Sequence, residues 1–219
     1  MLIWRRINTT VAAVAIGVPV IVGACGCTIE LAGPARLASG QGTAPAVSSH
    51  ASGPAVATVK ATFSAAITAV TSFGSPPAGY RMTVLSAIAM RQAVPGFSAT
   101  LASDLETSGK AEIARYFGPR QAVAERRALA AAMAFDANPH VINLGSGVTR
   151  ISFGNVSAKG AVATLSAEVT SWSRATRQRL TGSWLTDASV RVTRYSATLS
   201  LGMGGSWQVT VLTAATVAP

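Results

Sequence analysis

Few side chains in this chain of 219 residues have the types and spacing needed for acid–base chemistry. Asp136 and His140 are four residues apart in the segment FDANPH, and a carboxylate near an imidazole is suited to proton transfer. The segment also has the composition of a turn, because Asp, Asn and Pro favour turns, and this is the simpler interpretation. Glu168 is the third candidate. It would be a costly buried carboxylate if it faced a core, and an ordinary surface group otherwise.

Arginines form the densest cluster of like charge in the sequence. Arg174, Arg177 and Arg179 lie in the segment SWSRATRQRLTGSW, between Trp172 and Trp184. Guanidinium groups pair well with phosphate and carboxylate, so the cluster is a candidate contact for an anionic surface. A solvated connection between two strands would have the same composition. In either case we expect the three arginines to occupy an exposed loop.

Other motifs for catalysis or ligand binding are missing from the sequence. It has no G-x-S-x-G segment, and residues 202–205 (GMGG) lack phosphate-binding spacing and instead predict a hairpin turn. The only cysteines, Cys25 and Cys27, stand near the N-terminus, so the rest of the chain can form neither a disulfide nor a thiolate metal site. We therefore predict no metal, no cofactor and no complete catalytic set.

The first 27 residues have the layout of a bacterial export signal. Arg5 and Arg6 are followed by the uncharged run 11–24, which ends in small residues before Cys25. The tetrapeptide VGAC at 22–25 resembles the lipobox of bacterial lipoproteins. This resemblance implies that a diacylglycerol is attached to the thiol of Cys25 and that the chain is cut just before it. The mature chain would then be held at the membrane by lipid.

Two other fates of this segment stay open. The residues before position 25 also suit ordinary signal-peptidase cleavage, which would release the chain. Alternatively the segment stays uncut as a membrane anchor, although residues 7–24 number 18 and a spanning helix needs about 20. In all three cases Arg5 and Arg6 would hold the N-terminus on the cytoplasmic side, which places the remainder on the outer side of the membrane.

Positive charge is the second clear signal. The formal net charge is +10 at pH 7, and residues 25–219 hold 16 Lys or Arg against 8 Asp or Glu. A basic exported protein is expected near anionic surfaces. We predict the membrane as a partner through the lipid anchor, with lipid headgroups, an anionic envelope polymer or an envelope protein as further partners. No nucleic acid is predicted, because no aromatic-interleaved basic motif and no recognition-helix pattern is present.

Composition divides the chain into a signal peptide at 1–24, a flexible tether at 25–58 and a folded domain at 59–219. The tether is rich in Ala, Ser, Gly and Pro without apolar periodicity, and a coil of its length spans about 30 Å root-mean-square. It is long enough to clear the headgroup layer and little more.

Within the folded domain, apolar spacing changes along the chain. Helical spacing predicts helices at 59–73, 82–93, 99–117 and 119–134. Ser98 is a candidate N-cap, Pro119 suits the first position of a helix, and Ser108-Gly109 is a candidate break. Period-two spacing then predicts strands at 148–153, 161–172, 190–201 and 207–212. The expected fold class is α+β, with N-terminal helices packed on a curved C-terminal antiparallel sheet.

The order of these elements resembles the nuclear-transport-factor-2-like fold, a cystatin-like cone. The resemblance is carried by GVTRISFGNV, AVATLSAEVTSW and VRVTRYSATLSLGMGGSWQVTVLTAA, whose final hairpin turns at Gly204-Gly205 before Trp207. The family includes enzymes such as ketosteroid isomerase and many non-catalytic envelope modules, among them proteins associated with lipid importers and conjugation machines. Some enzymes of this fold use an Asp/His pair in the cone as general base and orienter, but Asp136 and His140 match no family motif specific enough to carry these roles over.

The tether, the basic domain and the incomplete catalytic set predict an exported, membrane-tethered, non-catalytic binding or assembly module of the bacterial cell envelope. The alternative is a small-molecule enzyme or carrier that uses the cone pocket, with Asp136, His140 or Glu168 in it. Geometry separates the two predictions, because the alternative requires two of these groups to point into one deep pocket.

Overall fold

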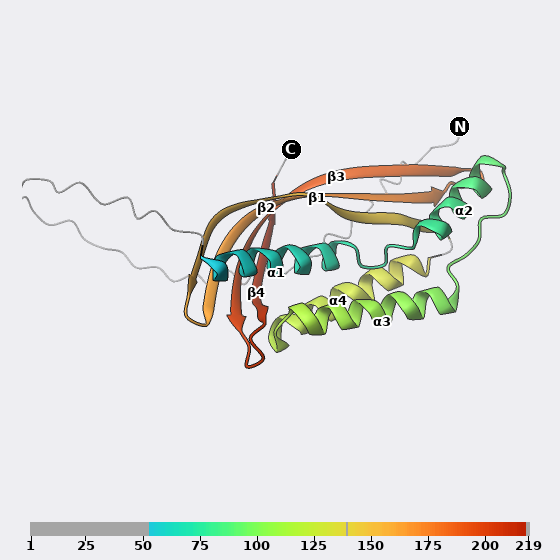
Figure 1. Cartoon of the computed structure of the whole chain (residues 1–219). Helices are drawn as coiled ribbons and strands as arrows, with labels where there is room; N and C mark the ends of the chain where they lie inside the picture. Colours follow the sequence, from blue (N-terminus) through green and yellow to red (C-terminus); the bar gives the residue numbers. More distant parts are fainter. Residues whose placement is uncertain (1–52, 139, 218–219) are drawn as a thin grey trace, which may run out of the picture. The chain divides into compact units, whose positions relative to one another are not determined.

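Four helices precede four strands along the chain in a computed structural model that describes residues 53–138 and 140–217 (Figure 1). The helices are α1 (Pro54–Thr71), α2 (Ala78–Ala89), α3 (Ala99–Tyr116) and α4 (Pro119–Asp136). The strands are β1 (Val141–Lys159), β2 (Val162–Gln178), β3 (Trp184–Leu201) and β4 (Trp207–Thr216). The predicted α+β class is confirmed. The predicted signal peptide, Cys25 and most of the tether lie outside the described residues.

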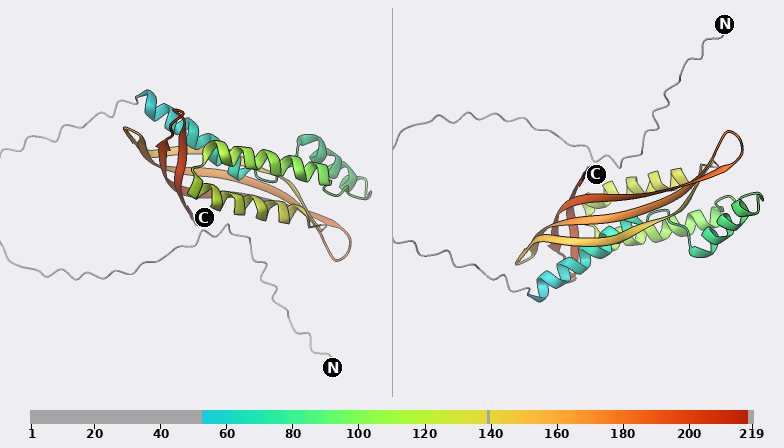
Figure 2. Two further views of the ribbon diagram at one scale, coloured as in Figure 1. Left: turned by 90° about the horizontal axis from the view of Figure 1, so that it is seen from below. Right: turned by 90° about the horizontal axis from the view of Figure 1, so that it is seen from above.

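The strands form one antiparallel sheet in the order β1-β2-β3-β4. The pairing of β2 with β3 runs without interruption from Val162↔Ser200 to Gln178↔Trp184. Figure 2 shows that the sheet curves and that α1, α3 and α4 lie together on one side of it. That side carries the main hydrophobic core.

The core forms where alternate residues of the strands meet the helices. On β2 the buried positions follow period two, as expected for a strand with one covered face: Ala163, Leu165, Ala167 and Val169. Phe63 of α1 is fully buried above them, and its ring centroid lies 5.9 Å from Phe153 and 6.2 Å from Tyr195 in edge-on packing. A smaller cluster joins Val84 of α2 to Ile142 and Leu144 of β1.

Helix ends follow local signals where such signals exist. The Oγ of Ser98 accepts a hydrogen bond from the backbone N–H of Leu101 at 3.1 Å, so the predicted N-cap of α3 is confirmed. Pro119 is the first residue of α4, as predicted. The other two helices begin earlier than apolar spacing indicates: α1 begins at Pro54 before Val59, and α2 begins at Ala78 before Met82. Both first turns are largely exposed, at Ala55 and Ala57 of α1 and at Ala78 and Gly79 of α2, so these residues add no buried position to the apolar pattern.

The predicted break at Ser108-Gly109 is wrong, because α3 is continuous through it. Gly109 is buried against α4, and a Cβ built on it would lie 2.7 Å from Cδ1 of Leu129. The glycine therefore permits close packing of two helices. It does not interrupt one.

This contact gives the first prediction. Gly109→Val should lower the free energy of unfolding by about 1–3 kcal/mol, because added methyl groups overpack the contact with Leu129. Gly79→Val is the matched control, since a Cβ at Gly79 on α2 meets nothing within 4 Å and exposed substitutions stay within about 0.5 kcal/mol. Urea denaturation measures both. Equal effects of the two substitutions would contradict the close approach of α3 and α4.

The strands are longer than predicted, and the predicted turn at Gly154-Asn155 is wrong. These residues lie inside β1 at a bulge, where the pairing with β2 shifts between Phe153↔Ala167 and Val156↔Leu165. The Oγ of Ser166 accepts a hydrogen bond from the backbone N–H of Asn155 at 3.2 Å. A glycine followed by asparagine suits a bulge as well as a turn, so their identity alone could not separate the two.

Candidate functional site

The structure does not bring Asp136, His140 and Glu168 together. Asp136 ends α4 and is buried. His140 is exposed, with Nδ1 3.1 Å from Oε1 of Gln178, and its backbone N–H donates to Oδ1 of Asn138 at 3.0 Å, the kind of contact expected of a turn. Glu168 is on the exposed face of β2, where its carboxylate lies 3.5 Å from the guanidinium of Arg194. An Asp/His pair is therefore not formed.

Asp136 is nevertheless an unusual residue, because its carboxylate is enclosed and has no satisfying partner. The residue is 5% exposed, and neither carboxylate oxygen has a hydrogen-bond partner among the described residues. A Cβ built on Gly74 would collide with Oδ2, so only glycine fits beside it. The nearby amide of Asn143 donates to the carbonyl oxygen of Gly74 at 3.0 Å. Burial raises the pKa of Asp136 to about 7, although the amide of Asn143 lowers it in part.

Asp136 lines a pocket of about 320 Å³ between the end of α4, the loop before α3 and the start of the sheet. Three aromatic residues share its wall: Tyr80, Phe97 and Trp184. The hydroxyl of Tyr80 donates to the carbonyl oxygen of Pro95 at 3.0 Å, and its ring packs edge-on against Phe97 at 5.4 Å. Burial raises the pKa of Tyr80, and the charge of Asp136 raises it further. Neither His140 nor Glu168 lines this pocket, so the geometric requirement for the catalytic alternative is not met.

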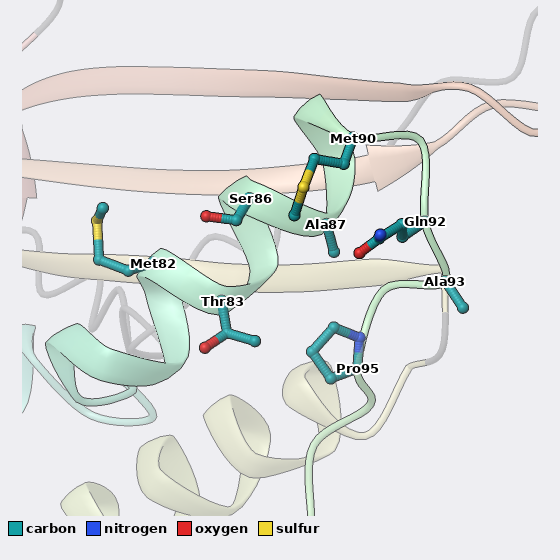
Figure 3. A pocket seen from close by; sticks show the side chains of 8 residues that line it. All are labelled: Met82, Thr83, Ser86, Ala87, Met90, Gln92, Ala93 and Pro95. Carbon is teal, nitrogen blue, oxygen red and sulfur yellow. The ribbon is translucent and has the colours of Figure 1, made fainter.

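A more open hollow of about 480 Å³ lies beside α2 (Figure 3). Its lining is uncharged: Met82, Thr83, Ser86, Ala87, Met90, Gln92, Ala93 and Pro95. Without an ionisable group in its wall, this hollow offers no acid or base. Within the described residues, no group of three or more His, Cys, Asp and Glu side chains could hold a metal ion.

The predicted loop position of the arginine cluster is wrong for two of its three residues. Arg174 and Arg177 lie on β2, and only Arg179 lies in the connection to β3. The paired strands extend to Gln178↔Trp184, so the connection is short. All three arginines are exposed, as predicted. A guanidinium nitrogen of Arg177 lies 3.1 Å from Oδ2 of Asp187 on β3.

Positive charge is concentrated on the sheet. Residues 141–217 hold seven Lys or Arg side chains and two Asp or Glu side chains. Both acidic groups, Glu168 and Asp187, form ion pairs with arginines of the sheet. The described helical part, residues 53–138, is closer to balance, with eight Lys or Arg against five Asp or Glu. The sheet thus presents an excess of cations that no acidic group of its own strands offsets.

Several residues of these sites were missed at the level of sequence. Tyr80, Phe97 and Trp184 come from distant segments, and no local pattern places them around Asp136. Glu125 is buried although the next two residues of α4, Arg126 and Arg127, are exposed, and its Oε1 accepts a hydrogen bond from Nε2 of Gln121 at 2.7 Å. Burial raises its pKa.

No protein-family model and no curated protein sequence matches this chain. Solved structures that are similar in part include the following three. CagV, a VirB8 homolog of T4SS from Helicobacter pylori strain 26695, aligns with a TM-score of 0.39 and 8% identity over 74% of this chain and 99% of that chain. The intermembrane space region of the chloroplast protein ARC6 aligns with a TM-score of 0.35 and 16% identity over 49% of this chain and 78% of that chain.

The third is an Ntf2-like protein involved in plasmid conjugation, with a TM-score of 0.32 and 12% identity over 54% of this chain and 42% of that chain. The structural neighbours thus include the family that the sequence resembles. All three TM-scores are below 0.5.

None of the helices within 53–138 and 140–217 is both long and apolar enough to cross a membrane.

Proposed function

We propose that the chain is an exported, lipid-tethered, non-catalytic binding or assembly module of the bacterial envelope, which docks on an anionic surface through its basic sheet. The proposal includes a signal peptide at 1–24, a tether at 25–58, a nuclear-transport-factor-2-like body at 59–219 and acylation of Cys25. Its support at the N-terminus is the VGAC tetrapeptide behind a charged start and an apolar run.

The charge distribution of the sheet is the observation that carries the docking function. Residues 141–217 hold seven cationic side chains and two acidic ones, and each acidic group already has an arginine partner. Cations in excess on one layer attract polyanions over about a Debye length, roughly 8–10 Å at physiological salt. The exposed arginines on and after β2 present planar donors suited to phosphate or carboxylate oxygens: Arg174, Arg177 and Arg179.

Catalysis is the less well supported function because its groups are apart. Asp136 is enclosed, His140 is exposed in a turn, and Glu168 is paired with Arg194 on the exposed face. A general base must come within hydrogen-bond reach of the proton that it abstracts. Neither His140 nor Glu168 lines the pocket beside Asp136, so this pocket holds no second acid or base from the candidate set.

The second prediction tests docking. The full chain in detergent should bind a labelled polyphosphate, and replacing Arg174, Arg177 and Arg179 with glutamine should weaken binding by roughly two decades, at about 1 kcal/mol per basic residue. Raising the salt concentration should mimic the loss. The matched control replaces three exposed arginines of α4 with glutamine, which makes the same change in net charge: Arg120, Arg126 and Arg127.

Binding that ignores salt, or that falls equally in both triple variants, would contradict docking through the sheet. The first result would mean that charge does not drive the contact. The second would mean that only the net charge of the chain matters and that its placement does not.

A small-molecule carrier is the second candidate function, and the enclosed carboxylate of Asp136 favours it. A buried carboxylate without partners is costly, and a ligand that donates a proton or carries positive charge would compensate for it. Small aromatic amines and phenols fit the aromatic wall of the pocket. Such a compound should raise the unfolding temperature of the wild type and lose this effect in Asp136→Asn. A compound set that stabilises neither protein would remove support for a carrier.

A further inference from the structure

The end of the β2–β3 hairpin combines arginines with exposed apolar side chains. We call residues 172–190 the distal hairpin. Its turn is closed by two hydrogen bonds: the N–H of Arg179 donates to the carbonyl oxygen of Ser183 at 2.7 Å, and the N–H of Gly182 donates to that of Arg179 at 2.8 Å. Gly182 has a φ of 79°, which suits glycine at a tight turn. Leu180, between Arg179 and Thr181, is fully exposed at the tip.

The tip extends past the ends of α3 and α4, at the end of the domain where α2 also lies (Figure 2). In Figure 2 the loop that joins β2 to β3 projects beyond α3 and α4 in both views. No residue of the loop between these strands belongs to either hydrophobic cluster of the described residues. The loop at the tip is therefore free to meet another surface, whereas Trp184 at the start of β3 packs against the second, smaller cluster.

More apolar surface lies along the two strands behind the tip. Val190 is 72% exposed and pairs with Trp172, and Leu185 is 41% exposed and pairs with Arg177. Because paired residues share a face of the sheet, each exposed apolar side chain has a tryptophan or an arginine beside it. Because successive strand residues alternate between faces, Val190 and Leu185 lie on opposite faces, so exposed apolar side chains occur on both faces of the hairpin behind its tip.

An anionic bilayer interacts favourably both with the arginines and with the exposed apolar side chains of the distal hairpin. Arginines gain from anionic headgroups, and leucine gains from the acyl boundary just below them. A soluble polyanion supplies only the charge, so it gives no reason for Leu180 to be exposed beside Arg179.

We infer that the distal hairpin inserts Leu180 into the headgroup region of an anionic phospholipid bilayer, with Arg174, Arg177 and Arg179 held at the headgroups. This inference rests on the proposed docking function and names its partner. A chain anchored at Cys25 by the proposed tether, about 30 Å long as a coil, would keep the domain near that bilayer.

The test places an environment-sensitive dye at the tip. The full chain carries Cys27→Ser and Leu180→Cys, is labelled on the new thiol, and is reconstituted into phosphatidylglycerol or phosphatidylcholine vesicles. The chain with Cys27→Ser alone measures labelling at Cys25. In phosphatidylglycerol the dye emission should shift to the blue and rise several-fold, and lipid-borne quenchers at headgroup depth should reduce it. High salt, or glutamine in place of Arg174, Arg177 and Arg179, should abolish the shift.

Met203→Cys, in the same Cys27→Ser background, is the matched control. Met203 is fully exposed at the tip of the β3–β4 hairpin, and no Lys or Arg follows Arg194 in the sequence. A dye at this position should emit alike with both lipids. Insertion driven only by apolarity would instead give the same shift at both tips.

The outcomes separate the inference from the function on which it rests. If polyphosphate binding depends on the distal arginines but the dye at position 180 stays in water on phosphatidylglycerol, bilayer insertion is overturned and docking stands. If polyphosphate binding is independent of salt and of these arginines, docking fails whatever the dye reports. A blue shift that requires a protein extract and no anionic lipid would assign the tip to a protein partner and also overturn insertion.

Discussion

Replacing Asp136 with asparagine should raise the free energy of unfolding at pH 8 and leave it nearly unchanged at pH 4. The pKa of Asp136 is about 7 in the folded chain, against an ordinary value of 3.8. Between these values the folded chain binds more protons than the unfolded chain, so stability is greatest below about pH 4 and falls as the pH rises through 7. Asparagine stays neutral and avoids the loss. We expect a gain on the order of 2–4 kcal/mol at pH 8.

Urea denaturation at several pH values measures this effect. Asp104→Asn is the control, because Asp104 is exposed on α3 and should give no comparable gain at pH 8. A variant that is less stable than the wild type at pH 8 would mean that the carboxylate of Asp136 has a partner in solution, such as the ligand of the carrier function. That result would move support from docking toward ligand binding.

Much of the fold could be predicted because its signals are local. The apolar residues of α1 and α4 recur at helical spacing. Ser98 and Pro119 mark where helices begin, because a serine hydroxyl caps the first turn and proline suits the first helical position. The covered half of β2 alternates from Ala163 to Val169, as burial on one face requires.

The sequence predicts a loop for the outer half of β2, because period-two spacing indicates burial of one face and does not indicate backbone pairing by itself. The residues SRATRQ of β2 contain no run of apolar residues at alternate positions, yet they pair with β3 to the last residue. Beyond the main core, polar side chains are tolerated on both faces, while the backbone hydrogen bonds continue. The alternation therefore fades before the strand ends.

The environment of Asp136 could not be predicted from its neighbours in sequence. An aspartate at the end of a helix, followed by Ala-Asn-Pro, normally lies at the surface. Its enclosure depends on Gly74 and on the pocket wall around Tyr80 and Trp184, all of which are distant along the chain. Only tertiary packing brings these residues together. The sequence therefore identifies Asp136 as a candidate, but it does not predict which residues surround its carboxylate.

Cys25→Ser should remove the chain from the membrane fraction. If Cys25 carries a diacylglycerol, two acyl chains hold the mature protein, and each buried CH₂ contributes about 0.8 kcal/mol. Losing both chains lowers membrane affinity by many decades, far more than any loss of arginines on the sheet. Mass spectrometry of the wild type should find a lipidated cysteine as the first residue. Cys27→Ser is the control and should stay anchored, because VGAC precedes Cys25 and the residues before Cys27 fit the motif poorly.

The same variant separates the three fates of the N-terminal segment. A wild type that retains Met1 and a Cys25→Ser variant that stays in the membrane would identify an uncut anchor. A wild type already free of the membrane, with an unmodified cysteine at its N-terminus, would identify cleavage and release. Lipid anchoring predicts neither result. It also holds the domain beside a bilayer, the condition under which a fully exposed Leu180 between Arg179 and Thr181 gains from insertion.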